Sequence, residues 1–292
     1  LRGGRIVGEG DPRDLTTAAL AEMMVGRPVR FNVEKTAFQP GETLLEVSGL
    51  SVLRDSDELA VDDVSLAVHS GEVVGIAGVQ CNGQSALIEA ITGLGSVAAG
   101  QIRFLGTDIT RAPVRARHRM GMAHIPEDRQ RAGLIAEFTV AENMVLDSYY
   151  DAPFSTRPQI DWSTVRSWAA WAAVAFDVRT PSVFARAGHL SGGNQQKLIV
   201  ARELSHDTKL VIAAQPTRGL DVGSIEYIHA RLMAARAEGA GVLIVSSELD
   251  EILALSDRIL VMFKGRIVAE YDATTTLPEK SRIGLAMAGV AA

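Results

Sequence analysis

One segment restricts the possible folds more than any other: a short apolar run, a glycine-rich loop and a helical pattern follow one another directly. The run is Val73–Ala77, and the loop reads Gly78-Val79-Gln80-Cys81-Asn82-Gly83-Gln84-Ser85. The loop fits the spacing G-x-x-x-x-G-K-[ST], in which backbone N–H groups at the start of a helix point at phosphates. A strand-turn-helix unit that needs glycines only for its bend is the alternative interpretation.

This loop, called the phosphate loop below, departs from the pattern at one position. Gln84 stands where the lysine is expected, so an amide replaces the charge that would neutralise the β- and γ-phosphates. The loss is one charge-assisted hydrogen bond, roughly 1.5–3 kcal/mol, which weakens binding without preventing it. Ser85 still offers a hydroxyl for Mg²⁺. We expect the nucleotide to contact Gly78, Asn82, Gly83, Gln84 and Ser85.

Short apolar runs alternate with helical patterns along the rest of the chain. The runs predicted to be buried strands are Val73–Ala77, Met122–Ile125, Leu210–Ala214, Val242–Val245 and Ile259–Met262. The predicted helices are Ser85–Thr92, Asn194–Leu204 and Ile225–Glu238. This alternation predicts an α/β fold with a parallel sheet covered on both faces.

Composition argues against several classes of protein. Hydrophobic residues make up 47% of the chain, yet no run approaches the roughly 20 apolar residues that span a bilayer. The net charge is -6, and no basic stripe offers a surface for nucleic acid. The six histidines show no metal-ligand spacing, so no zinc site is expected. A single cysteine and the lack of a signal-like start favour a reducing cytoplasm, and the initial Leu1 indicates a fragment or processed chain.

The two ends of the chain resemble each other. Gly4-Arg5-Ile6-Val7 matches Gly265-Arg266-Ile267-Val268 at an offset of 261, and Met24-Val25-Gly26 parallels Met287-Ala288-Gly289 at an offset of 263. Both ends are predicted to form a short strand followed by a helix. Chance explains one such match, but the shared order of both favours duplication.

This repeat predicts where the boundaries lie. Residues 1–26 are expected to be the tail of a preceding copy, and residues 27–43, which have two prolines and no clear period, a linker. Residues 44–292 are then a complete unit.

A second motif reads Leu190-Ser191-Gly192-Gly193-Asn194-Gln195-Gln196-Lys197. Ser191 can cap a helix, while the two glycines let an anion approach the N–H groups of its first turn. A plain helix cap is the alternative. The string closely resembles the signature of ABC-transporter nucleotide-binding domains, in the L-S-G-G-N-Q-Q-K form of importers for simple sugars and nucleosides.

Three further segments resemble that family in family order, over residues 44–272. They are Ala213–Gly223 for the Walker B strand and D-loop, His124–Arg129 for the Q-loop region, and Ser246–Glu248 for the switch histidine. The resemblance implies an ABC-ATPase fold, with a P-loop core, an N-terminal antiparallel β subdomain and a helical subdomain at about 130–205.

In that family two such domains pair head to tail, and each ATP, with Mg²⁺, lies between the phosphate loop of one and the signature of the other. The resemblance therefore implies that Ser191, Gly192, Gly193 and Asp221 face ATP bound by a partner domain, often fused in the same polypeptide. It also implies membrane-spanning permease subunits as partners, a solute-binding protein as an indirect partner, and a peripheral location on the cytoplasmic face of the membrane.

The catalytic positions of the family are altered here. Ala214 replaces the Walker B aspartate, Gln215 the catalytic glutamate and Ser247 the switch histidine, while Glu127 replaces the Q-loop glutamine. Loss of a general base alone typically costs 10²–10⁴ in rate. The sequence therefore predicts a chain that binds nucleotide better than it hydrolyses it.

Smaller departures point the same way. Cys81 replaces a glycine that the family's loop usually carries, and its β-carbon is expected either to crowd the phosphates or to strain a left-handed backbone position. No aromatic residue occurs between Leu50 and Asp62, where the family stacks adenine.

Trp168 and Trp171, one helical turn apart, are expected to pack, with a contact to membrane subunits as the alternative.

Other functions stay open at this point. A self-sufficient ATPase conflicts with the missing lysine, aspartate, glutamate and histidine. A non-transport ABC protein acting on DNA or ribosomes conflicts with the sugar-importer signature, and a remnant of a broken importer gene is the third alternative. Among importers, the Ala213–Gly223 string favours nucleosides over sugars.

Overall fold

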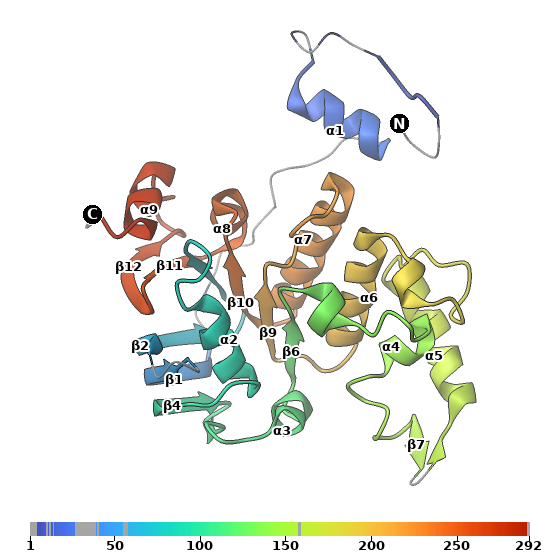
Figure 1. Ribbon diagram of the computed structural model, residues 1–292, viewed down its shortest axis with the longest axis horizontal. Coiled ribbons are helices and arrows are strands. Elements are labelled where there is room, and N and C mark those ends of the chain that lie inside the picture. Colours follow the sequence, from blue (N-terminus) through green and yellow to red (C-terminus); the bar gives the residue numbers. More distant parts are fainter. Residues whose placement is uncertain are drawn as a thin grey trace.

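A mostly parallel sheet lies at the centre of the computed structural model (Figure 1). Its strand order is β12-β11-β3-β10-β9-β6, and all neighbours are parallel except β12 and β11. The strands are β3 (Val73–Ala77), β6 (Met122–Ile125), β9 (Leu210–Ala214), β10 (Gly241–Ser246), β11 (Arg258–Phe263) and β12 (Arg266–Asp272). Every residue of β3, β9 and β10 is buried, which explains their unbroken apolar sequences. The predicted buried strands are confirmed.

The structure describes residues 5–9, 11, 13, 15–26, 39, 41–54, 58–156 and 159–290. Most of the predicted linker, residues 27–43, lies outside this set, and so do residues 1–4, which include Gly4 of the repeat. Within the N-terminal stretch, α1 (Thr17–Val25) is capped by Thr16 and ends at Gly26.

Helices and a second sheet cover the two faces of the central sheet. Alternate strand residues point to opposite faces. On one face, Val74 and Ile76 pack with α2 (Gln84–Thr92) and the second sheet. On the other face, Val73 and Ala77 pack with α6 (Gly192–Leu204), α7 (Val222–Ala237) and α8 (Leu249–Leu255). The three predicted helices correspond to α2, α6 and α7.

The second sheet is antiparallel and has the order β2-β1-β4-β5. It consists of β1 (Thr43–Leu53), β2 (Leu59–His69), β4 (Ala99–Phe104) and β5 (Thr107–Asp108). This sheet is the antiparallel β subdomain implied by the resemblance.

The remaining elements include a helical region beside β6 and β9 (Figure 1). The remaining elements are α3 (Val114–Arg119), a short π-helix at Arg129–Gly133, α4 (Val140–Met144), the hairpin β7 (Ser155–Thr156) and β8 (Gln159–Ile160), α5 (Trp162–Ala175), a 3-10 helix at Ala187–His189 and α9 (Lys280–Met287). Among the described residues, every helix is too short or too polar to cross a membrane.

The tryptophans of α5 differ in their surroundings. Trp168 packs against the core and meets Phe154 edge-on, with ring centroids 5.2 Å apart. Trp171 is 57% exposed. The packing interpretation is confirmed for Trp168 and wrong for Trp171, because only the face of α5 that carries Val165 and Ala169 is turned toward the core.

A buried ion pair joins α7 to the central sheet. Asp257 accepts hydrogen bonds from Val73 N at 2.8 Å and from Arg236 Nε at 3.1 Å, and both charged side chains are at most 4% exposed. Removing one partner of such a pair leaves a buried charge without compensation.

We expect Asp257→Ala to lower the free energy of unfolding by about 3–5 kcal/mol. The matched control is Asp207→Ala, which removes the carboxylate of an exposed pair with Lys209 and should cost at most about 1 kcal/mol. Urea unfolding followed by circular dichroism measures both changes. Equal effects would contradict a structural role for the Arg236–Asp257 pair.

Candidate nucleotide-binding site

The phosphate loop joins the carboxyl end of β3 to the start of α2. Gly83 lies at the N-cap of α2 with a φ of 105°, and a Cβ there would lie 2.2 Å from the carbonyl oxygen of Ala60. Only glycine fits this position. Among the described residues, no side chain caps the start of α2, so its first N–H groups are available to an anion.

Neighbouring segments hold the loop in place. Asn82 Oδ1 accepts from Lys264 N at 3.1 Å, and the Asn82 carbonyl accepts from Gly265 N at 2.8 Å. Cys81 has a φ of 69°, which is the left-handed conformation expected from the sequence. The Cys81 carbonyl accepts a hydrogen bond from Arg54 Nη2 at 3.2 Å. The Asn82 side chain therefore binds the turn between β11 and β12.

A cavity of about 550 Å³ opens beside this loop. It is lined by Arg54, Ala60, Gln80, Cys81, Gly83, Gln84, Ser85, Ala86, Ile88, Glu89, Glu127, Ala214, Gln215, Arg218 and Val245. The fold thus brings the phosphate loop together with Glu127 and Ala214, which the resemblance assigns to the Q-loop and Walker B positions. Cavities of this size accommodate small-molecule ligands.

Polar contacts inside the cavity centre on Glu127. Its carboxylate accepts from Ser85 Oγ at 3.1 Å and from Arg218 Nη1 at 2.9 Å. Gln84 Nε2 donates to the carbonyl of Val79 at 3.0 Å, so its amide is bonded to the loop itself. A carboxylate therefore contacts the hydroxyl that the sequence assigns to Mg²⁺.

Two cations of the cavity, Arg54 and Arg218, are absent from the sequence-based set of site residues. Arg218 lies within the segment that resembles Walker B, so its position in that string was a usable signal. Arg54 follows β1 and becomes a cavity residue only through the packing of the antiparallel sheet on α2, which no local pattern indicates.

Two of the positions that the resemblance assigns to catalysis, Gln215 and Ser247, contact each other. Gln215 Oε1 accepts from Ser247 N at 3.1 Å and from Ser247 Oγ at 3.2 Å, and Gln215 has a φ of 48°. Ala214 ends β9 and offers only a methyl group. These three positions provide neither a carboxylate nor an imidazole to position or deprotonate a water molecule.

The signature residues lie on a separate surface. Ser191 Oγ accepts from Asn194 N at 3.4 Å as the N-cap of α6, and Asp221 Oδ1 accepts from Ser224 N at 3.0 Å as the N-cap of α7. A Cβ on Gly193 would lie 2.2 Å from Ser224 Oγ and 3.2 Å from Asp221 Oδ2. The two caps are therefore adjacent, and Gly193 permits their close approach.

The electrostatics of Asp221 favour its ionised form. Partial burial works to raise the pKa of Asp221, but hydrogen bonds from Ser224 and from the backbone N–H groups of Asp221 and Gly223 together hold the pKa below its usual value. Ser191, Gly192, Gly193 and Asp221, called the signature patch below, lie outside the lining of the nucleotide cavity.

Comparison with known proteins identifies the family to which this chain is similar. The family described as "ABC transporter" matches residues 61–218. The chain is 45% identical to the nucleoside import ATP-binding protein NupA of Lactococcus lactis subsp. cremoris (strain MG1363), over 99% of this chain and 57% of that protein. It is also 45% identical to the guanosine import ATP-binding protein NupO of Bacillus subtilis (strain 168), over 99% of this chain and 56% of that protein. The chain spans about half the length of these curated relatives.

A solved structure agrees with the sequence relatives. The crystal structure of a nucleotide-free ATP-binding cassette from an ABC transporter matches with a TM-score of 0.69 and 25% identity, over 83% of this chain and 99% of that one. The family match, the fold and the cavity beside the phosphate loop lead to one conclusion: the chain belongs to the ABC transporter family of ATP-binding domains.

Proposed function

We propose that this chain is an ATP-binding part of an importer for simple sugars or nucleosides, and that it completes the ATP site of a partner domain. The observation that carries this proposal is an asymmetry between two surfaces. The signature patch keeps the serine, glycines and aspartate of the family, whereas Gln84, Ala214, Gln215 and Ser247 lack the charged groups that hydrolysis requires. The names of the relatives NupA and NupO favour nucleosides.

The partner is proposed to be a first nucleotide-binding domain that precedes this one in the same or a paired polypeptide. In this proposal residues 1–26 end that domain, residues 27–43 are the linker and residues 44–292 are the second domain, with its helical subdomain at about 130–205. Helix α1 begins 263 positions before α9, which is the offset of the Met24–Gly26 repeat. Permease subunits on the cytoplasmic face of the membrane, and indirectly a solute-binding protein, complete the assembly.

The chain's own site is proposed to retain nucleotide without cleaving it efficiently. The uncapped start of α2 and the Ser85 hydroxyl suit phosphates and Mg²⁺, and ATP with Mg²⁺ is what the family binds. The positions that would orient water carry Gln215 and Ser247, which are hydrogen-bonded to each other. Nucleotide held here would then act mainly to keep the two domains together.

Substitutions in the signature patch and in the chain's own nucleotide site test whether the two surfaces have these different roles. In the assembled importer, Ser191→Arg should remove most ATP turnover, because a long cation would enter the partner's ATP site. Ser85→Ala should reduce turnover only modestly, because it alters the site that already lacks its catalytic groups. Ser182→Arg, on an exposed loop of the same region, is the control for added charge and should leave turnover near the unsubstituted rate. An equal collapse from Ser191→Arg and Ser85→Ala would refute the proposal.

The missing lysine can be tested on the chain itself. Gln84→Lys should tighten binding of a fluorescent ATP analogue by about 10-fold or more, because one charge-assisted hydrogen bond is worth roughly 1.5–3 kcal/mol. Gln80→Lys adds the same charge to an exposed position of the same loop, where roughly 0.2–1 kcal/mol corresponds to about 5-fold at most. If both variants tighten binding equally, net charge and not the family's lysine position controls affinity.

A further inference from the structure

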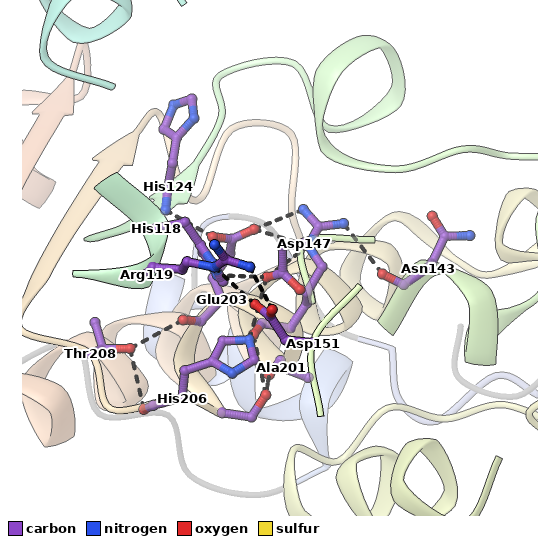
Figure 2. Close-up of polar contacts among 12 residues, drawn as sticks. His118, Arg119, His124, Asn143, Asp147, Asp151, Ala201, Glu203, His206 and Thr208 are labelled. Atoms are coloured by element: carbon purple, nitrogen blue, oxygen red, sulfur yellow. Dashed lines mark hydrogen bonds and ion pairs between the residues drawn. The ribbon is translucent and has the colours of Figure 1, made fainter. Parts of the chain in front are cut away.

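Two histidines and an aspartate converge at a place that the nucleotide site does not use. His118 is on α3, Asp147 follows α4 and His206 follows α6, so three separate segments meet here. Figure 2 shows these side chains grouped beside Glu203. None of the three lines the nucleotide cavity.

The spacing of their ligand atoms suits a tetrahedral metal ion. Asp147 Oδ2 lies 3.2 Å from His118 Nε2 and 3.4 Å from His206 Nε2, and all three atoms lie within 4.8 Å of one another. Ligands bound tetrahedrally to Zn²⁺ at about 2.0–2.1 Å are separated by roughly 3.3–3.4 Å. The histidine rings are nearly perpendicular, at 84°. Two of the three ligand separations already have the required length.

Both histidines lie at ion-pair distance from Asp147, but these contacts lack the alignment of good hydrogen bonds. Among the described residues, both carboxylate oxygens of Asp147 and Nε2 of His206 are buried without a partner in hydrogen-bond geometry. Short nitrogen–oxygen distances without that alignment are expected when the atoms share a cation, because each then points at the ion and not at its neighbour. Buried polar atoms left without such a partner are costly.

The nearest Arg–Glu pair does not neutralise the carboxylate of Asp147. Arg202 Nε lies 3.9 Å from Asp147 Oδ2, but its guanidinium binds Glu203 at 2.9 Å and the carbonyl of Gly133 at 2.9 Å. Glu203 also accepts from His124 N at 2.9 Å. Arg202 and Glu203 thus neutralise each other, which leaves the charge of Asp147 to the two histidines or to a bound ion.

We propose that His118, Asp147 and His206 bind one Zn²⁺ ion. Two imidazole nitrogens and one carboxylate oxygen form a ligand set that Zn²⁺ favours, and the fourth position would take water. A cavity of about 370 Å³ lined by His118, Asp147, Arg202 and Glu203 gives access. The ion would tie α3, the segment after α4 and the segment after α6 together.

The distances along the chain explain why the sequence predicts no zinc site. Short-range histidine spacing is what identifies such sites in a sequence, whereas His118, Asp147 and His206 are far apart in the chain. Only the fold brings them together.

Zinc retention by matched variants tests the proposal. The chain is prepared with Cys81→Ser to remove its one thiol, stripped with a chelator, loaded with Zn²⁺ and passed through a desalting column. We expect one zinc per chain, and loss of that zinc in His206→Gln and in Asp147→Asn. The control His189→Gln removes an exposed histidine elsewhere and should keep the metal.

Two further readouts distinguish ligand loss from misfolding. Zn²⁺ should raise the thermal unfolding midpoint of the parent and of His189→Gln but not of His206→Gln, and each variant's midpoint in chelator shows whether it folds. His118→Gln serves if His206→Gln is unfolded. Co²⁺ should give the visible absorption of a tetrahedral ion in the parent and in His189→Gln but not in His206→Gln. A parent that retains no zinc, or equal retention by the His189→Gln and His206→Gln variants, would overturn the proposal.

Discussion

The site depends on one constraint: the strands of a parallel sheet end at the same edge. β3 runs into the phosphate loop, β9 ends at Ala214 and β10 at Ser246, while β6 leads toward Glu127. Residues far apart in the chain therefore line one cavity at the carboxyl ends of the strands, where open α/β sheets bind ligands. The buried, apolar character of these strands stabilises that edge.

The groups at this edge of the sheet determine which reactions the site can support. The start of α2 and the glycines of the loop offer backbone N–H groups to phosphates, and these do not depend on side-chain charge. In the proposed function, hydrolysis would require charged side chains at the positions of Gln84, Ala214, Gln215 and Ser247, which are all neutral. The polar side chains of the cavity bond to one another: Glu127 binds its neighbours, and Gln215 binds Ser247. The signature patch, by contrast, keeps the groups that the proposed partner would use.

Much of the fold was predictable from the sequence because strands buried on both faces leave unbroken apolar runs. The limits of β3, β6 and β9 match those runs residue for residue. The strained φ of Cys81 was also predictable, since the family has glycine there. Side-chain partners were not: Gln84 turns back onto the carbonyl of Val79 in its own loop, and the Arg218–Glu127 pair depends on packing between distant segments. The exposure of Trp171 and the meeting of His118 with His206 depend on tertiary structure in the same way.

The central claim is that this chain holds nucleotide at a site without the groups to cleave it. Phosphate release by the purified chain alone, with ATP and with or without Mg²⁺, tests that claim most directly. We expect ATP to bind while phosphate appears no faster than in a matched sample without the chain. Rapid release that requires Mg²⁺ would contradict the account, because Ala214, Gln215 and Ser247 provide no group to support it.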